Sequence, residues 1–267
     1  MLPIFTYHGF NIAGNAYADN DHVALASDLR TLHARGRKVF ALSKIVDHLL
    51  LGTLAELGDG VGISFDDGTD FDAIDLTHPV HGRQRSLLGI LSDFRQETNM
   101  PVIATAFVIA SPAARLAIAH REVFGQDWMR SSWWPSAQAS GLLEIGNHSW
   151  DHQHPALIDA NTGQPKSGRF DDITSLALAE TEIADAQRLI EQLAPGPAAA
   201  LFAYPYGQSN DFLRHDYLPH QQRRHGIRAA FGCTPAKVQA ATDRWQIPRY
   251  VCGLHWKSAA EFSRLLD

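Results

Sequence analysis

The chain has 267 residues, of which 45% are apolar and 19% charged, a balance typical of a globular protein that buries one substantial core. The net charge of -6 and the lack of a basic run argue against nucleic acid or an anionic membrane surface as the main partner. We find no internal repeat or interdomain linker, so residues 1–267 are interpreted as a single domain.

No stretch has the length of a membrane span, and the start MLPIFTYHGF lacks the pattern of a secretory signal. As written, the chain is expected in the cytoplasm; it would be exported if a signal has been removed from it. Cys233 and Cys252 are too few for a disulfide framework and too far apart for a thiolate metal site. We expect both to be small core residues.

Short apolar runs alternate with helical patterns along the chain. The runs predicted as strands are 2–8, 38–42, 61–65, 102–109, 142–147, 200–204, 227–232 and 247–251. Amphipathic or capped helices are predicted over 21–36, 172–196 and 258–266. Residues 69–83 and 110–133 lack clear periodicity and are predicted to be long loops after strands.

This alternation predicts an α/β fold with a parallel sheet covered by helices. About eight strands in this order favour a closed or nearly closed barrel, and an open doubly wound sheet is the alternative. In a barrel, the loops that follow the strands build the active-site face.

The strand 61–65 ends at two adjacent aspartates, Asp66 and Asp67, in the stretch GISFDDGTDF. The residues expected to be buried before them are Val61, Ile63 and Phe65. Two neighbouring anions at the edge of a core repel each other and resist desolvation unless a cation is held nearby. A bound metal would meet that need, and a solvated Asp-Asp-Gly turn is the alternative.

A second polar stretch, EIGNHSWDHQHP at 144–155, also follows a predicted strand. His148 and His152 are four residues apart, so on one helical turn both imidazoles would project from the same face, as paired histidine ligands do. His154 competes with His152 as the second ligand, but residues six apart do not share a helical face. Surface histidines in a polar loop are the alternative.

A third stretch, LFAYPYGQSND at 201–211, leaves a predicted strand and turns at Pro205 and Gly207. Together the three stretches resemble the polysaccharide deacetylases of the NodB-homology type, also called carbohydrate esterase family 4. SFDDG is similar to the first motif of that family, HSWDH to its His-Ser/Thr-x-x-His motif, and YPYG to the later half of its Arg-x-Pro-Tyr-Gly motif. The resemblance extends over about residues 60–250 and implies a deformed (β/α) barrel of about seven to eight parallel strands.

Carried over to this sequence, the resemblance implies that Asp67, His148 and His152 bind one divalent metal, zinc first, with cobalt or nickel as alternatives. Such a set leaves open positions for water and substrate. By the same resemblance Asp66 is the general base, and the backbone N–H of Tyr206 contributes to the oxyanion hole.

The sequence also departs from the family pattern. The motif arginine that orients the general base would fall at Ala203, so another residue must hold Asp66. Arg249, in the last predicted strand, is our candidate, because a strand entering a barrel can aim one long cation at the site. A structural salt bridge elsewhere is the alternative for Arg249.

The general acid of the family is commonly a histidine in a late Leu-x-His motif, and two histidines are candidates here. His255 in GLHWKS follows the last strand, although Trp256 replaces the usual aspartate. His8 in TYHG resembles a Tyr-His near the start of a family subgroup and could face the site. A core histidine bonded to a backbone carbonyl is the alternative for His8.

Two groups of residues could extend the site. The loop after the first motif could line a polar groove, form a second metal site or be a solvated charge run; its residues are Asp70, Asp72, Asp75, His78 and His81. Four tryptophans could stack on sugar rings or simply pack in the protein; they are Trp128, Trp133, Trp134 and Trp150.

We therefore predict a metal-dependent hydrolase that removes acetyl groups from an N-acetylated amino sugar, with a carbohydrate as substrate. One alternative is a related enzyme that hydrolyses another C–N bond, such as a cyclic imide or ureide. The other is a carbohydrate-binding relative that has lost catalysis. Intact Asp66, Asp67, His148 and His152 argue against that last interpretation, because a binder has little need for both base and ligands.

Overall fold

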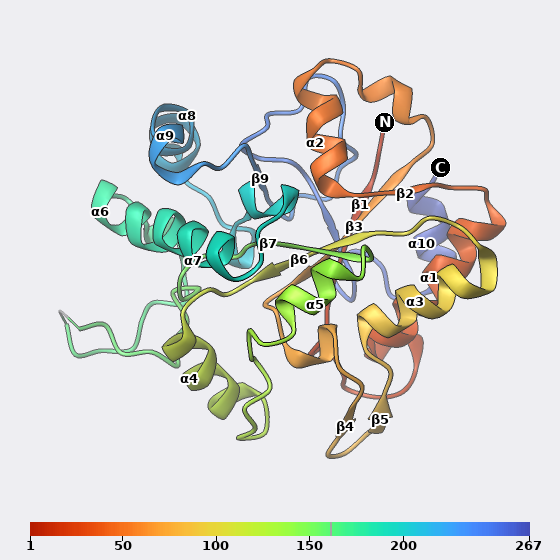
Figure 1. The fold of residues 1–267 in the computed structure, drawn as a ribbon, viewed down its shortest axis with the longest axis horizontal. Helices are drawn as coiled ribbons and strands as arrows, with labels where there is room; N and C mark the ends of the chain where they lie inside the picture. The colour runs from red at the N-terminus through yellow and green to blue at the C-terminus, as the bar shows by residue number, and fades with distance from the viewer. Residues whose placement is uncertain (161) are drawn as a thin grey trace.

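The computed structural model describes residues 1–160 and 162–267, in which strands and helices alternate (Figure 1). The strands are β1 (Ile4–His8), β2 (Val39–Phe40), β3 (Val61–Asp66), β4 (Leu76–His78), β5 (Gly82–Gln84), β6 (Ala104–Val108), β7 (Leu143–Asn147), β8 (Leu201–Ala203), β9 (Ala229–Phe231) and β10 (Tyr250–Val251). The α-helices are α1 (Asp21–Ala34), α2 (Leu42–Leu50), α3 (Leu87–Thr98), α4 (Pro112–Glu122), α5 (Trp134–Ala139), α6 (Leu176–Ala179), α7 (Ala186–Leu193), α8 (Leu218–His220), α9 (Gln222–His225) and α10 (Ala259–Leu265).

The strands form one parallel sheet and a separate hairpin. Seven strands follow one another in the order β10-β1-β3-β6-β7-β8-β9, and β2 pairs with the start of β3. β4 and β5 form the antiparallel hairpin outside this sheet. The prediction of an α/β fold with seven to eight parallel strands is confirmed.

The sheet curves into a deformed, partial barrel rather than an open doubly wound sheet. β10 pairs with β1, and just before it Ile247 forms a parallel bridge with Phe231 of β9. Two backbone hydrogen bonds of 2.9 Å, between Ile247 and its neighbours Ala230 and Gly232, support this bridge. The segment that ends in β10 therefore spans the gap between the two edges of the sheet.

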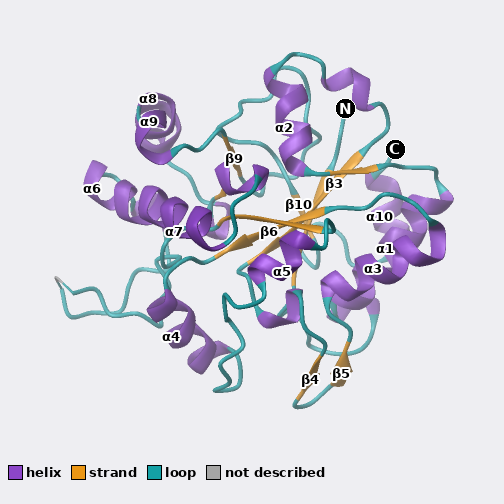
Figure 2. Ribbon diagram, viewed as in Figure 1, coloured by secondary structure: helices purple, strands orange, loops and turns teal. Residues whose placement is uncertain are grey.

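Helices cover the outer face of the sheet (Figure 2). Side chains of β1 and β3, including Phe5, Ile63 and Phe65, pack there in one cluster with apolar residues of α1, α3 and α10. The residues predicted to be buried ahead of the aspartate pair are all at most 1% exposed; they are Val61, Ile63 and Phe65. Their burial fixes the strand whose last residue is Asp66.

The inside of the barrel is apolar at one end and polar at the other. Gly62, near the start of β3, leaves space for α2, since a Cβ there would lie 2.6 Å from Leu42. Two residues further along β3, Ser64 shares a hydrogen bond of 2.9 Å with Thr6 in the interior of the barrel. Helix α2 thus fills the barrel at the starts of the strands. Polar side chains follow toward the strand ends, where barrel enzymes have their active sites.

Several predicted boundaries were wrong. Residues 110–133 are not a continuous loop but contain α4, which Ser111 caps by accepting a hydrogen bond from Ala114 N and which has a proline in its first turn. Its buried residues are Ala114, Arg115, Ile118 and Ala119, a set that gives a weak apolar signal. The predicted strand 38–42 is shorter, because Leu42 already begins α2, and α2, α3 and α5 were not predicted.

Candidate active site

The polar residues of the predicted site converge where parallel strands end. His8 ends β1 and Asp66 ends β3, and the two are direct partners in the register of these strands. Paired residues in neighbouring strands present their side chains on the same face of a sheet. Arg249 immediately precedes β10 and so stands level with the start of β1, on the side of β1 opposite β3. Its long side chain runs past Ser64 to reach Asp66 at the end of β3.

Asp66 and Arg249 form a buried, two-pronged ion pair. The two guanidinium N–H groups donate to the two carboxylate oxygens over 2.7 and 2.8 Å, and Arg249 is 0% exposed. Arg249 also donates to Ser64 Oγ over 3.1 Å and to the carbonyl of Gly232 over 3.1 Å. Burial is the largest single influence and by itself raises the pKa of Asp66. The charge and hydrogen bonds of Arg249, together with the nearby His148, outweigh burial, so the pKa lies below its ordinary value.

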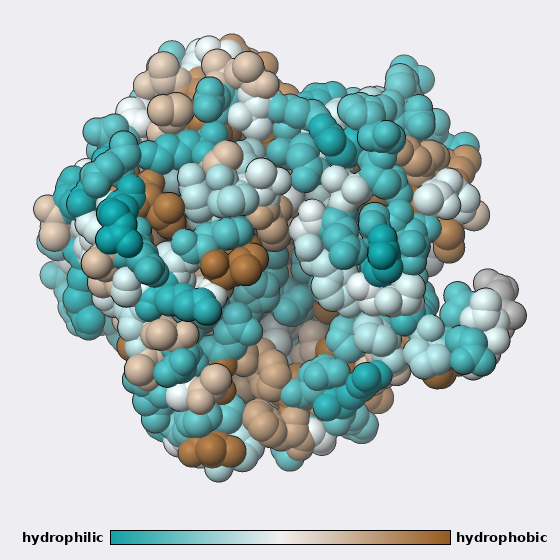
Figure 3. Space-filling view, turned by 180° about the vertical axis from the view of Figure 1, so that it is seen from behind, coloured by the Kyte–Doolittle hydropathy of each residue, from teal (hydrophilic) through white to brown (hydrophobic). Residues whose placement is uncertain are grey.

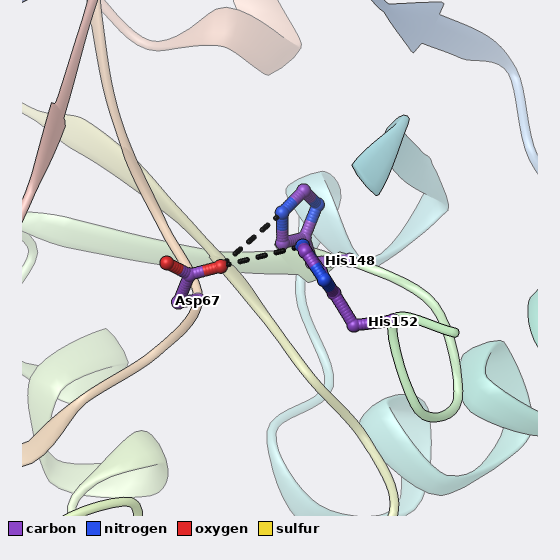
Figure 4. Close-up of side chains that lie close together, drawn as sticks. All are labelled: Asp67, His148 and His152. Atoms are coloured by element: carbon purple, nitrogen blue, oxygen red, sulfur yellow. Dashed lines mark ion pairs between the residues drawn. The ribbon is translucent and has the colours of Figure 1, made fainter. Parts of the chain in front are cut away.

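Asp67 has a different environment from its neighbour. Its φ of +76° is uncommon for a residue with a side chain, and its carboxylate points toward two histidines (Figure 4). Asp67 Oδ1 lies 3.6 Å from His148 Nε2 and 3.5 Å from His152 Nε2. The two adjacent aspartates thus have different partners. Asp66 pairs with Arg249, and Asp67 faces the two histidines.

His148 is held through its other ring nitrogen. Its Nδ1 lies 2.8 Å from the backbone carbonyl of Ala203, at the end of β8. A carbonyl can only accept, so Nδ1 carries the proton and Nε2 presents a lone pair toward Asp67 and His152. Ala203, the position of the family's arginine, therefore contributes its backbone rather than its side chain.

His152 reaches the site from a bent loop and not from a helical turn, so that prediction was wrong. Ser149, His152 and Gln153 all have positive φ values, between +48° and +73°, which no α-helix allows. The loop nevertheless brings the ring of His152 to 4.9 Å from that of His148. Burial, followed by repulsion from His148, lowers the pKa of His152 well below its ordinary value. Its ring is therefore neutral near neutral pH.

Asp67, His148 and His152 fit a divalent metal ion. One potential ligand atom from each lies within 4.8 Å of the others. One carboxylate and two imidazoles are donors that zinc and similar ions accept, and three protein ligands leave a position for water or substrate. Among the described residues, this is the one such group with metal-ligand geometry, and His154 is not part of it.

Tyr206 stands at the edge of the same site. It has a φ of +58° in the short turn after β8, and its ring lies 4.3 Å from that of His152, edge to face. The residue is 43% exposed, so the ring borders the opening rather than the core. The turn thus places the ring of Tyr206 next to one of the histidines, and Tyr206 and Gly207 both line the cleft.

The two candidates for the general acid lie in different places. His8 lines the cleft, and its Nδ1 faces the carboxylate of Asp21 at 4.0 Å. Asp21 Oδ2 also accepts a 2.7 Å hydrogen bond from the backbone N–H of His8. His255 instead turns back on its own chain, since its Nδ1 accepts from Val251 N over 2.8 Å, and it does not line the cleft.

The site lies at the bottom of a cleft of about 580 Å³. Beyond the residues already described, its walls are largely apolar and include Phe10, Ile109, Ile118, Met129 and Leu254. The back face of the molecule is hollowed near its centre, with apolar surface along one margin (Figure 3). Cys233 also lines the cleft and is only partly buried, in contrast to the core position that we predicted; Cys252 is buried as expected.

The loop after the first motif is neither a solvated charge run nor a second metal site among the described residues. Asp70 and Asp72 are both 0% exposed. Asp70 accepts hydrogen bonds from Arg130, and Asp75 pairs with Arg85. Asp72 lies against Gly9 with one carboxylate oxygen unpaired, and burial raises its pKa well above the ordinary value.

None of the four tryptophans lines the cleft, so of the two possibilities the structure supports packing and not sugar stacking at this site. Trp133 and Trp134 are buried in the main core, and Trp150 packs against it. Trp128 meets the ring of Phe71 edge to face at 5.5 Å. All four positions are packing positions.

The sequence model of the family described as polysaccharide deacetylase matches residues 57–230, more than half of the chain. The chain therefore belongs to the polysaccharide deacetylase family. His8 and Arg249 lie outside the matched range, although the fold brings both beside Asp66. A search of curated proteins finds no significant match.

Solved structures share this fold. PplD, a deacetylase from Streptococcus pyogenes solved in complex with acetate, is similar over 100% of this chain and 98% of its own, with a TM-score of 0.67 and 15% identity. IcaB from Ammonifex degensii is similar over 99% and 95%, with a TM-score of 0.62 and 19% identity. BC0361, a polysaccharide deacetylase from Bacillus cereus, is similar over 100% and 69%, with a TM-score of 0.65 and 13% identity.

No described helix combines the length and the apolar character needed to cross a bilayer.

The sequence did not reveal Asp21 as the partner of His8, because Asp21 has the ordinary features of a first-turn helix residue. It also gave no sign of the ion pairs around the His152 loop described below.

Proposed function

We propose that the protein is a metal-dependent deacetylase that hydrolyses the acetamide of an N-acetylated amino sugar. The observation that carries this proposal is the division of the aspartate pair: Asp66 is bonded to Arg249, and Asp67 faces His148 and His152. One carboxylate is thereby kept free of the ligand set and ionised, as a general base must be.

Asp67, His148 and His152 would hold the divalent ion, with zinc as our first choice and cobalt or nickel as alternatives. When bound, the ion would supply Lewis-acid activation of the attacking water and of the acetyl carbonyl. The hydrogen bond from His148 Nδ1 to the carbonyl of Ala203 fixes the tautomer that ligation needs.

Asp66 accepts the proton of the water as it attacks the acetyl carbon. Arg249 holds the carboxylate in place through both oxygens, which takes over the role of the arginine absent at Ala203. Because Arg249 also lowers the pKa of Asp66, the base is ionised at neutral pH, at the cost of some basicity.

The tetrahedral intermediate needs a donor for its oxyanion and an acid for its leaving amine. The backbone N–H of Tyr206 is our donor, since its turn lies beside His152. His8 is our acid, because it shares the strand-end register of Asp66 and is backed by Asp21, whereas His255 lies outside the cleft. The proton passes from His8 to the amine nitrogen as the C–N bond breaks.

The test is acetate release from N-acetylhexosamine oligomers by protein that has been stripped of metal and reloaded with zinc, cobalt or nickel. We expect release that depends on the added ion. Ring opening of cyclic imides is measured in parallel. Hydrolysis of imides without release of acetate would replace the first choice by the alternative C–N hydrolase, and neither reaction with any ion would leave a catalytically silent binder.

A further inference from the structure

The loop that carries His152 continues into a segment that leaves the body of the protein. The described parts of this segment, residues 155–160 and 162–168, extend away from the sheet in Figure 1 before the chain returns toward α6. A bridge between Ile158 and Pro165 holds its two sides together. Lys166, on the returning side, points back to the site loop.

Lys166 is the cation of a buried cluster next to the site. Its ammonium pairs closely with Asp151, the neighbour of His152, and lies 3.7 Å from Glu182 Oε1. The side chains of Lys166 and Glu182 are 17% and 2% exposed. Ion pairs this enclosed are screened little by water, and loss of one partner leaves a buried charge uncompensated.

Glu182 ties the same loop to the short π-helical turn Glu180–Asp185 between α6 and α7. Its carboxylate accepts from Gln153 Nε2 over 2.7 Å and from the backbone N–H of Asp151 over 3.3 Å. Its backbone carbonyl accepts from Trp150 N over 2.8 Å. Three of the four residues from 150 to 153 are therefore bonded to one glutamate.

The His152 loop needs such support. Ser149, His152 and Gln153 have positive φ, a strained conformation for a residue with a side chain. Among the described residues, His152 Nδ1 is buried without a hydrogen-bond partner, whereas His148 is oriented through Nδ1 by Ala203. The direction of the His152 ring thus depends on the backbone of its loop.

We propose that Lys166, with Asp151 and Glu182, is a positioning residue for the metal site. The ion pair between Lys166 and Asp151 keeps the strained loop in the conformation that aims His152 Nε2 at Asp67. The projecting segment therefore contributes to metal affinity through a cation that touches neither the metal ligands nor the cleft. This inference rests on the proposed function, in that it assumes a divalent ion at this site.

The experiment measures the zinc dissociation constant of the metal-free protein by competition with a chromophoric chelator. The variants are Lys166→Met, Asp151→Asn and the double variant, with Lys257→Met as control. Lys257 is exposed, and its side chain enters none of the ion pairs found among the described residues. The spectrum of bound cobalt reports the ligand geometry, and the near-ultraviolet circular dichroism of each metal-free variant reports its fold.

We expect Lys166→Met to weaken zinc binding by about 10- to 100-fold, as for other groups that orient metal ligands, and to shift the cobalt spectrum. Lys257→Met should bind like the wild type. The double variant should lose less than the two single losses combined, because Lys166 and Asp151 act through the same ion pair and either single change already removes it.

Three results would overturn the proposal. Zinc affinity of a folded Lys166→Met within twofold of the wild type would remove the positioning role and leave the proposed function intact. Loss of the metal-free fold in both single variants would assign the cluster to stability alone. Wild-type protein that binds neither zinc nor cobalt would overturn the proposed function as well.

Discussion

The two halves of the site are built differently. On the strand side, His8, Asp66 and Arg249 stand on or beside β1, β3 and β10, and the Asp66 to Arg249 pair is nearly inaccessible to solvent. On the loop side, His152 stands in a turn with three positive φ angles. The first half is fixed by sheet register, and the second depends on side-chain contacts from a segment outside the sheet.

This difference assigns different sensitivities to the two halves. A group on paired strand ends is placed by backbone hydrogen bonds that many residues share, so its orientation survives changes nearby. A group on a bent loop is placed by few bonds, and the loss of one moves it. We therefore expect chemistry to fail when the strand side changes and metal affinity to fail when the loop side changes.

The strand side gives the largest expected effect. Replacing Asp66 by Asn removes the general base and should lower the rate of acetate release by about 10²- to 10⁴-fold. Zinc affinity should stay close to that of the wild type, because Asp66 faces Arg249 and not the ligand set. A parallel loss of metal would contradict the separation of the two halves.

Replacing Arg249 by Met should lower the free energy of unfolding by about 3–5 kcal/mol at neutral pH, since Asp66 is left as a buried, unpaired charge. The pKa of Asp66 is lowered in the folded protein, so the stabilisation is full above the ordinary aspartate pKa of about 4 and is lost as the pH falls through the folded value. The difference between wild type and variant, measured by urea unfolding from pH 7 to pH 3, should therefore shrink in acid. A difference that does not depend on pH would point to lost packing instead.

His8 and His255 provide a test within the strand side. His8→Ala should slow hydrolysis by about 100-fold, as expected for the loss of a general acid. His255→Ala should change the rate by less than about twofold, because His255 lies outside the cleft. A larger loss of rate for His255→Ala than for His8→Ala would identify His255 as the general acid instead.

Asp72 can be compared with Asp66, since both carboxyl groups are buried but only Asp66 is paired with an arginine. Burial, then the charges of Asp67 and Asp66, raise its pKa well above the ordinary value. A raised carboxyl pKa costs the folded state stability as the pH rises. Asp72→Asn should therefore gain on the wild type between about pH 4 and pH 7, by on the order of 1 kcal/mol in the metal-free protein. A difference in the free energy of unfolding between Asp72→Asn and the wild type that is the same at both pH values would contradict this.

The smallest expected effect is a change in backbone exchange on metal binding. Adding zinc to metal-free protein should slow amide hydrogen exchange in residues 148–153 by several-fold, because the ion ties His148 and His152 together. Amides of β3 should not change, since the sheet already protects them. Equal slowing in both regions would mean that the two halves are not independent.

Local sequence allowed the strand ends to be predicted well. The apolar alternation in β3 placed Asp66 and Asp67 at the lip of the core, and the spacing of His148 and His152 pointed to a shared ligand role. The helical turn assumed for these histidines was wrong, because nothing in HSWDH marks Ser149 and His152 as residues with positive φ. Only their contacts hold them there.

The sequence by itself determined the alternation of strands and helices, the family and the order of the motifs, because these follow from local apolar periodicity and short polar signatures. The tertiary structure decided that Arg249 pairs with Asp66, 183 residues away, rather than with a partner elsewhere, and that Lys166 and Glu182 brace the His152 loop. The reason is physical. Local patterns indicate which residues are buried, but the partner of a buried charge depends on the register of the barrel strands and on where distant loops pack. Neither can be read from a local pattern.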